Sequence, residues 1–347
     1  MTKEFKAALE AARHKIPFAL FAYPGETVFH FMANPGGVIA DCPYFIINKW
    51  NSTFDESAKV YDEMDATRFL TELPNLKSFP SCSPLQQPST SRSEYIRKIE
   101  SLIESLKERG GKTVFSRIIS ETDITLDLEK LLCTQFESFP GTFRFFYYTP
   151  DTGLWLGTSP EILFEFNRNN RTFRTMSLAG TRMTDSRPWD NKNIKEQNLV
   201  AEFISDVLKK NGATFKVERC NDVQFKPVCH ICDMFSGEMH SSDCTQVINE
   251  LSPTPALSGF PVSKALEEIS MLESHQRECY GGYVGYVTDN FLKCYVNLRS
   301  LKLMESGYCI FAGGGITADS NPEEEWQETE NKTMILRRNI SGATINK

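Results

Sequence analysis

Apolar side chains recur at helical spacing along several stretches of the chain. Residues 94–109 are predicted to form a helix that ends at Gly110, with one apolar face made of Tyr95, Ile99, Leu102 and Leu106. Residues 190–210 predict a second long helix, with an apolar stripe of Leu199, Val200, Phe203, Ile204 and Val207. Residues 1–15 indicate a short amphipathic helix.

Segments rich in β-branched and aromatic residues predict strands elsewhere. Residues 112–120 form one predicted strand, which places Lys112, Val114 and Ser116 on one face. Strands and turns are predicted within 17–50, a hairpin within 143–166, and two antiparallel strands within 280–304. Hairpins mixed with long helices favour an α+β fold over a doubly wound parallel sheet.

The stretch 78–93 is rich in serine and proline and is predicted to be a linker. It separates an N-terminal subdomain, residues 1–90, from the rest of the chain, residues 91–347. The two are expected to form one compact domain.

Two predicted helices carry carboxylates where apolar residues would be expected. Glu196 continues the stripe of the 190–210 helix towards its N-terminus, one turn before Val200. The simpler interpretation is a surface glutamate that favours the positive end of the helix dipole, because glutamate is rarely buried unless paired.

The last predicted helix begins at Ser320, an expected N-cap, with Glu323 three residues later as a capping box. Glu325, Glu328 and Lys332 share one face of this helix. They could form a solvated face with a weak Glu328–Lys332 ion pair. Alternatively, Glu196 and Glu328 could together hold Mg²⁺, which usually takes one or two protein carboxylates.

Two further features could bind an anion. Gly313, Gly314 and Gly315 precede the last helix and could direct backbone N–H groups at a ligand, although a plain turn is the more common explanation. Arg299 is predicted to lie on a strand, where an inward-facing guanidinium could bind a substrate carboxylate through two hydrogen bonds.

Composition and charge restrict the function. The formal net charge of −7 argues against nucleic acid, and an anionic ligand would need local positive charge or a bound cation. Ten scattered cysteines, including the pair in Cys229–Cys232, are typical of reduced thiols rather than a zinc site. We expect a cytoplasmic protein, since the chain shows neither a signal peptide nor a membrane span.

Eight segments, taken together and in order, resemble the chorismate-binding enzymes. They are GKTVFSR, GTSPEILF, SLAGTR, NIKEQNLV, LSPTPALSGFP, YGGYVG, VNLR and FAGGGITADSNPEEEWQETENK, and they extend from about residue 93 to 340. The resemblance implies the fold of anthranilate synthase component I, with large antiparallel sheets flanked by helices. It also implies Mg²⁺ as cofactor and chorismate as substrate.

A few positions indicate the subfamily. Lys112 matches the water-activating lysine of isochorismate and salicylate synthases, and Leu178 stands where aminodeoxychorismate synthase has a nucleophilic lysine. The triplet 255–257, Pro-Ala-Leu, resembles enzymes that stop at isochorismate. Two positions depart from the family pattern: Ser252 and Gln197 each replace a histidine.

The resemblance assigns roles to individual residues. Lys112 resembles the base that activates water, and Glu161 resembles the acid that protonates the departing hydroxyl. A free lysine titrates near ~10.4 and a free glutamate near ~4.3, so both roles need a pocket that shifts these values. Glu196 and Glu328 match metal ligands, with Glu325 as a further candidate. The residues that match substrate contacts are Gly180, Thr181, Ala256, Leu257, Tyr280, Arg299, Gly315 and Lys332.

The expected activity is therefore isochorismate synthase, with water added at C2 of chorismate and the C4 hydroxyl lost. The alternatives are salicylate synthase, anthranilate synthase component I, and a catalytically inactive relative that acts as a binding protein. No glutaminase subunit, nucleic acid or membrane partner is expected. The sequence does not decide the oligomeric state or whether the pathway makes menaquinone or a siderophore.

Overall fold

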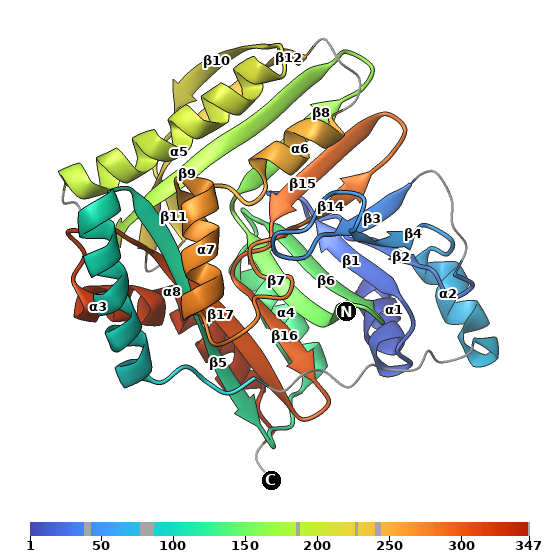
Figure 1. Ribbon diagram of the computed structural model, residues 1–347. Helices are drawn as coiled ribbons and strands as arrows, with labels where there is room; N and C mark the ends of the chain where they lie inside the picture. Colours follow the sequence, from blue (N-terminus) through green and yellow to red (C-terminus); the bar gives the residue numbers. More distant parts are fainter. Residues whose placement is uncertain (38–42, 77–86, 185–187, 226–227, 240–243, 346–347) are drawn as a thin grey trace.

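The computed structural model describes residues 1–37, 43–76, 87–184, 188–225, 228–239 and 244–345. These residues form one sheet of eight strands and one of nine, and every described pair of neighbouring strands is antiparallel (Figure 1). Helices flank both sheets, so the predicted α+β fold with large antiparallel sheets is confirmed.

The first sheet runs, in spatial order, through β13 (Gly259–Phe260), β5 (Lys112–Thr122), β17 (Gly307–Ile316), β16 (Ser300–Met304), β7 (Gly153–Ser159), β6 (Phe143–Thr149), β1 (Phe18–Ala22) and β2 (His30–Ala33). The second runs through β10 (Ala213–Arg219), β12 (Val228–Met239), β9 (Thr172–Met183), β8 (Ile162–Asn167), β15 (Phe291–Val296), β14 (Tyr283–Val287), β3 (Tyr44–Ile47) and β4 (Ala58–Tyr61), with β11 (Val223–Phe225) paired to β12.

The helices are α1 (Lys3–Arg13), α2 (Ala66–Glu72), α3 (Arg92–Arg109), α4 (Leu128–Ser138), α5 (Asn191–Lys210), α6 (Thr245–Leu251), α7 (Val262–Leu272) and α8 (Pro322–Ala343), with a 3₁₀ turn at Leu73–Asn75. The predicted helices at 1–15, 94–109 and 190–210 are confirmed as α1, α3 and α5. No helix in the described ranges is long and apolar enough to cross a membrane.

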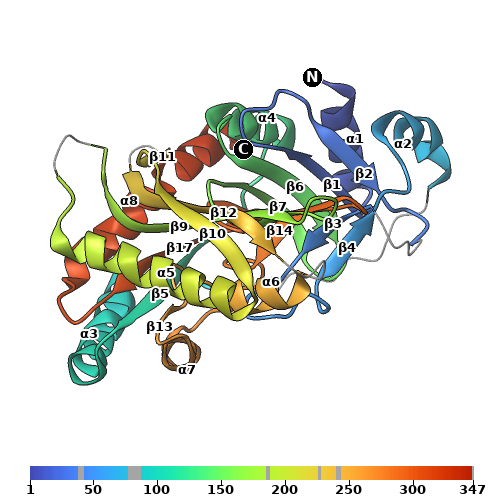
Figure 2. The same cartoon turned by 90° about the horizontal axis from the view of Figure 1, so that it is seen from above.

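The hydrophobic clusters of the described residues show four layers. One cluster packs α1, α4 and α8 against the outer face of the first sheet, and another packs α5 and α6 against the outer face of the second. A third cluster lies between the sheets and contains side chains of both, such as Trp155 and Tyr295. Figure 2 shows α1 and α4 on one side of the sheets and α5 and α6 on the other.

The N-terminal strands complete both sheets. Strands β1 and β2 extend the first sheet beyond β6, and β3 and β4 extend the second beyond β14. The boundary near residue 90 stays a prediction about the order of segments along the chain. Residues 78–86 of the predicted linker lie outside the described residues. Gln87, which follows them, is buried and hydrogen-bonds the backbone of Gln276.

Two local predictions were wrong. Helix α8 begins at Pro322 with Asn321 as its N-cap, whose Oδ1 accepts from the amides of residues 323 and 324. Ser320 lies one residue too early, and its hydroxyl instead donates to Glu325 Oε1 at 2.7 Å. Arg299 lies in the bend between β15 and β16, with φ of 44°, rather than on a strand.

Candidate active site

A cavity lies where the chain passes between the two sheets. Pro160 and Glu161 connect β7 of the first sheet with β8 of the second, and Arg299 lies on the return from β15 to β16. The two connections run side by side. The Val296 amide donates to the Glu161 carbonyl at 3.0 Å, and the Thr158 amide donates to the Arg299 carbonyl at 3.3 Å. The sheet crossings therefore place an acid and a cation at one cavity.

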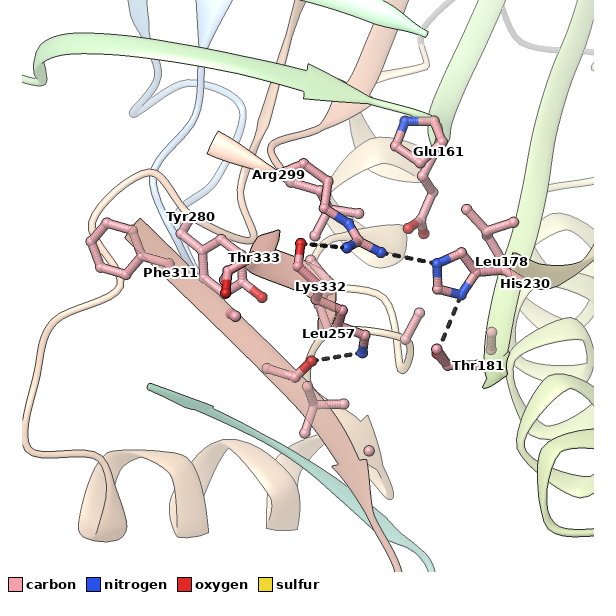
Figure 3. A pocket seen from close by; sticks show the side chains of 18 of the residues that line it. Glu161, Leu178, Thr181, His230, Leu257, Tyr280, Arg299, Phe311, Lys332 and Thr333 are labelled. Carbon is pink, nitrogen blue, oxygen red and sulfur yellow. Dashed lines mark hydrogen bonds between the residues drawn. The ribbon is translucent and has the colours of Figure 1, made fainter. Parts of the chain in front are cut away.

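The cavity gathers most residues that the sequence singled out, as Figure 3 shows for the labelled ones. Those among its lining residues are Glu161, Gly180, Thr181, Glu196, Ala256, Leu257, Tyr280, Arg299, Gly315 and Lys332. The other three, Lys112, Glu325 and Glu328, form the ion pairs described below. The free volume is about 70 Å³. Ligand pockets usually measure roughly 300–1,000 Å³, so a ring-sized ligand requires paired side chains to separate.

Glu161 is a buried carboxyl group directed into the cavity (Figure 3), with 2% of the residue exposed. Burial raises its pKa to about 8, and the opposing effect of the nearby Lys112 ammonium is smaller. Desolvation penalises the ionised form, so Glu161 carries a proton near neutral pH. A buried protonated carboxyl can serve as a general acid.

Lys112 and Glu196 form an ion pair at the wall of the cavity. Lys112 Nζ lies 2.5 Å from Glu196 Oε1, and the lysine side chain is 1% exposed. Burial alone would raise the pKa of Glu196, but the ammonium of Lys112 holds it below its ordinary value. Gly315 makes this contact possible, because a Cβ there would lie 2.5 Å from Lys112 Cε and 2.8 Å from Glu196 Oε1. The carboxylate predicted at Glu196 thus faces inward and is paired.

Two more carboxylates lie on α8, each paired with a lysine. Glu328 Oε1 contacts Lys332 Nζ at 2.6 Å, and Glu325 Oε1 accepts from Lys192 Nζ at 2.8 Å. Burial, followed by the charge of Glu328, raises the pKa of Glu325. Glu325 Oε2 is buried without a hydrogen-bond partner among the described residues, and it faces Gly314 together with Glu328. An unsatisfied buried oxygen suits an added cation or proton donor.

The three carboxylates approach neighbouring glycines of β17, Glu196 at Gly315 and the other two at Gly314. They are not arranged as ligands: among the described residues no three His, Cys, Asp or Glu side chains are grouped so that they could hold a metal. Each carboxylate is turned towards a lysine instead. Their chemistry and placement fit a hard divalent cation, provided that these ion pairs open.

Arg299 is a partly buried guanidinium held by backbone and ring contacts. It donates to the Lys332 carbonyl at 2.9 Å and to His230 Nε2 at 3.0 Å (Figure 3). Burial lowers its pKa to about 10, so it stays protonated at neutral pH. Among the described residues it has no carboxylate within ion-pair distance. A partly buried cation that no carboxylate contacts directly favours an anionic ligand.

His230 lines the cavity, although the sequence did not single it out. Arginine can only donate, so Nε2 of His230 accepts from Arg299 and Nδ1 carries the proton. His230 Nδ1 lies 3.0 Å from the Gly180 carbonyl oxygen and 3.2 Å from Thr181 Oγ1. Burial, then the charges of Arg299 and Lys332, lowers the pKa of His230 well below its ordinary value. A neutral histidine thus links Arg299 to β9.

The predicted glycine–threonine pair lies at a bulge in β9. The β12 register skips Gly180, which has φ of 65°, and the irregularity turns its carbonyl towards His230. Helix α5 satisfies the neighbouring amides: Asn193 Oδ1 accepts from Thr181 at 2.7 Å, and Gln197 Oε1 accepts from residue 179 at 2.9 Å. Gln197, one of the two departures from the family pattern, is fully buried and ties Glu196's helix to the sheet.

The remaining predicted contacts lie on the opposite wall. The Tyr280 ring stacks on Phe311 at 5.6 Å between centroids, and Leu257's carbonyl accepts from Arg277 Nη1 at 2.9 Å.

Ser252, the second departure from the family pattern, ends α6 and is not a cavity-lining residue. Cys229 is buried, and its thiol donates to the Met183 carbonyl at 3.9 Å.

A family model described as "Chorismate binding enzyme" matches residues 38–341. The chain belongs to this family. Isochorismate synthase MenF of Escherichia coli is 27% identical to this chorismate-binding enzyme over 303 residues, which cover 82% of the chain and 69% of MenF. Isochorismate synthase EntC of the same organism is 33% identical over 240 residues, covering 65% of the chain and 61% of EntC. The chain thus spans less than two thirds of EntC's length.

The fold agrees with solved structures. The structure of MenF, the menaquinone-specific isochorismate synthase from Escherichia coli, superposes with a TM-score of 0.78 at 19% identity. It covers 96% of this chorismate-binding chain and 91% of MenF. The predicted anthranilate synthase component I-like architecture is also confirmed: the structure of that protein from Streptococcus pneumoniae TIGR4 matches with a TM-score of 0.63 at 18% identity and covers 90% of this chain and 75% of that one.

Proposed function

We propose that this protein is an isochorismate synthase, which converts chorismate to isochorismate with Mg²⁺. The observation that carries the proposal is the presence, at one cavity, of Glu161, a buried carboxyl whose pKa is raised to about 8, and of Lys112, which is ion-paired with Glu196 at the cavity wall. Relatives named isochorismate synthase support the same activity.

The reaction needs a base at C2 and an acid at C4. Lys112 Nζ takes a proton from water, whose oxygen adds to C2 of the ring. The ring double bond shifts, and the C4 hydroxyl departs as water with the proton of Glu161. Lys112 lies on the first sheet and Glu161 on the crossing to the second, so the substrate ring lies between them. Lys112 Nζ lies 2.5 Å from Glu196 Oε1, so this contact has to open before Nζ can reach the attacking water.

The substrate carboxylates need positive charge. Arg299 is partly buried and has no direct ion-pair partner among the described residues, and Lys332 lines the same cavity. An arginine fork can bind one carboxylate through two hydrogen bonds, which fixes the ring as well as its charge.

The candidate metal site supports the proposal because its carboxylates are the oxygen ligands that Mg²⁺ prefers, although they are not arranged around one point. Glu196 and Glu328, with Glu325 as a third group, would hold Mg²⁺ at the Gly314–Gly315 backbone. Bound there, Mg²⁺ would neutralise a substrate carboxylate and draw electrons from the ring. Lys192 and Lys332 hold the α8 carboxylates close to that position.

Product identity tests this function. Purified protein incubated with chorismate and MgCl₂ is expected to give isochorismate. Salicylate with pyruvate would make the protein a salicylate synthase, and anthranilate formed on adding ammonium would make it an anthranilate synthase component. No product at all would refute the proposal.

Two alanine substitutions, one at Lys112 and one at an exposed lysine, test the base assignment. Lys112→Ala is expected to abolish turnover while chorismate still binds in the presence of Mg²⁺. Lys107→Ala removes a lysine whose side chain is 54% exposed on α3, and it should leave turnover unchanged. Substantial turnover by Lys112→Ala would refute the base assignment.

A further inference from the structure

Arg299 must be held in place by something other than a carboxylate. It lies in a bend at a positive φ, and its hydrogen bonds among the described residues go to the Lys332 carbonyl and to His230 Nε2. Two hydrogen bonds leave other N–H donors of the five on a guanidinium for a ligand. A long, flexible side chain in that position needs a surface that fixes its plane.

Phe225 supplies that surface. The guanidinium carbon of Arg299 lies 4.6 Å from the centre of the Phe225 ring, within the range of a cation–π contact. Phe139 stacks on Phe225, with 4.5 Å between ring centres and 8° between planes. Both phenylalanines are buried, at 5% and 8% exposure, so the contact is shielded from water.

The two rings are not part of the general core. Neither Phe139 nor Phe225 belongs to a hydrophobic cluster formed by the described residues. Phe139 caps the end of α4, and Phe225 ends β11. In the same pair of strands, Val223 of β11 lies opposite His230 of β12. One hairpin therefore brings both a ring and a hydrogen-bond acceptor to Arg299.

We propose that Phe225, supported by the stacked Phe139, is a positioning residue that sets the plane of the Arg299 guanidinium for a substrate carboxylate. The substrate part of this inference rests on the proposed function. The ring touches no reacting atom and acts only through Arg299. The π face of the Phe225 ring stabilises the guanidinium cation. Unlike a carboxylate, the ring does not compete with an incoming anion for the N–H donors of Arg299.

Steady-state kinetics with chorismate test the inference. Phe225→Leu keeps an apolar side chain but removes the ring, and KM is expected to rise about tenfold, the scale of a desolvated cation–π contact. The value of kcat should change less than about threefold, because Arg299 binds a carboxylate in both ground and transition states. Phe225→Tyr restores a ring and should restore KM.

A second aromatic stack provides the control. Phe173 is 2% exposed and stacks on Phe164 at 5.7 Å, away from Arg299, so Phe173→Leu should lower stability without raising KM. An unchanged KM in Phe225→Leu, or an equal rise in Phe173→Leu, would overturn the inference.

An activity-independent measurement separates this inference from the proposed function. The side-chain N–H resonances of Arg299, assigned by their loss in Arg299→Lys, should show the upfield ring-current shift of a group above a ring. This shift should vanish in Phe225→Leu and persist in Phe173→Leu. If wild-type protein neither binds nor converts chorismate, the proposed function fails, while this shift still decides the contact. Identical Arg299 resonances in wild type and Phe225→Leu would refute the positioning role.

Discussion

Glu161→Gln tests the physical basis of the acid assignment without needing turnover. The wild-type carboxyl has a pKa of about 8 in the folded chain because it is buried, and an ordinary value near 4.5 when unfolded. With a pKa of 8, about 90% of Glu161 is protonated at pH 7, compared with roughly 0.2% for an ordinary glutamate. Glutamine mimics the protonated form and cannot ionise.

The sign of the stability effect follows from proton binding. Between these two pKa values the folded state holds a proton that the unfolded state has released, so folding stability falls as pH rises. The contribution is fully present below about pH 4.5 and is lost by about pH 8. The slope approaches about 1.4 kcal/mol per pH unit, so this group alone should lower wild-type stability by about 2.5 kcal/mol between pH 5 and 7.

Urea unfolding of both proteins at pH 5, 6, 7 and 8 measures this difference. The stability of Glu161→Gln relative to wild type should increase steadily with pH. Turnover in the variant should fall about 10²–10⁴-fold, the usual contribution of a general acid. In wild type, turnover should decline above about pH 8. Parallel stability curves for the two proteins would show that Glu161 is not buried as an acid, and the reasoning would fail.

Three further substitutions have defined expected outcomes. Gly315→Ala places a Cβ within 2.8 Å of both Lys112 and Glu196, so it should abolish turnover in an activity assay. Gly141→Ala is the control: a Cβ at Gly141 meets open space, so turnover should not change. Glu325→Gln should weaken Mg²⁺ binding measured by calorimetry, while Glu323→Gln, at an exposed position, should not; equal affinities would exclude Glu325 from the metal site. Asn321→Ala removes the α8 cap and should cost about 1 kcal/mol in urea unfolding, and a neutral result would contradict the cap assignment.

Periodicity predicted the local structure well because helices and strands depend on neighbouring residues. Helix α5 and its apolar stripe follow from spacing alone, and so does the strand that carries Lys112. The cap of α8 was misplaced because Ser320 and Asn321 are both good N-caps, and only the backbone distinguishes them.

The site needed information that periodicity does not contain. Lys112 and Glu196 are 84 positions apart, and His230 and Arg299 are 69 apart, so no local pattern joins them. His230 gave no signal because a single histidine in an apolar strand looks like any buried polar residue. Motif resemblance located Glu161 and Arg299, although neither lies inside a strand.

The two sheet crossings also affect how the protein reaches its functional state. Glu161 and Arg299 lie on connections that each join one sheet to the other, and Lys112 and Thr181 belong to different sheets. An intermediate with only one sheet formed would lack part of the cavity, however native its helices were. Regained turnover therefore requires both sheets to be formed and docked on each other, whereas far-ultraviolet circular dichroism reports helices and strands whether or not the sheets are docked.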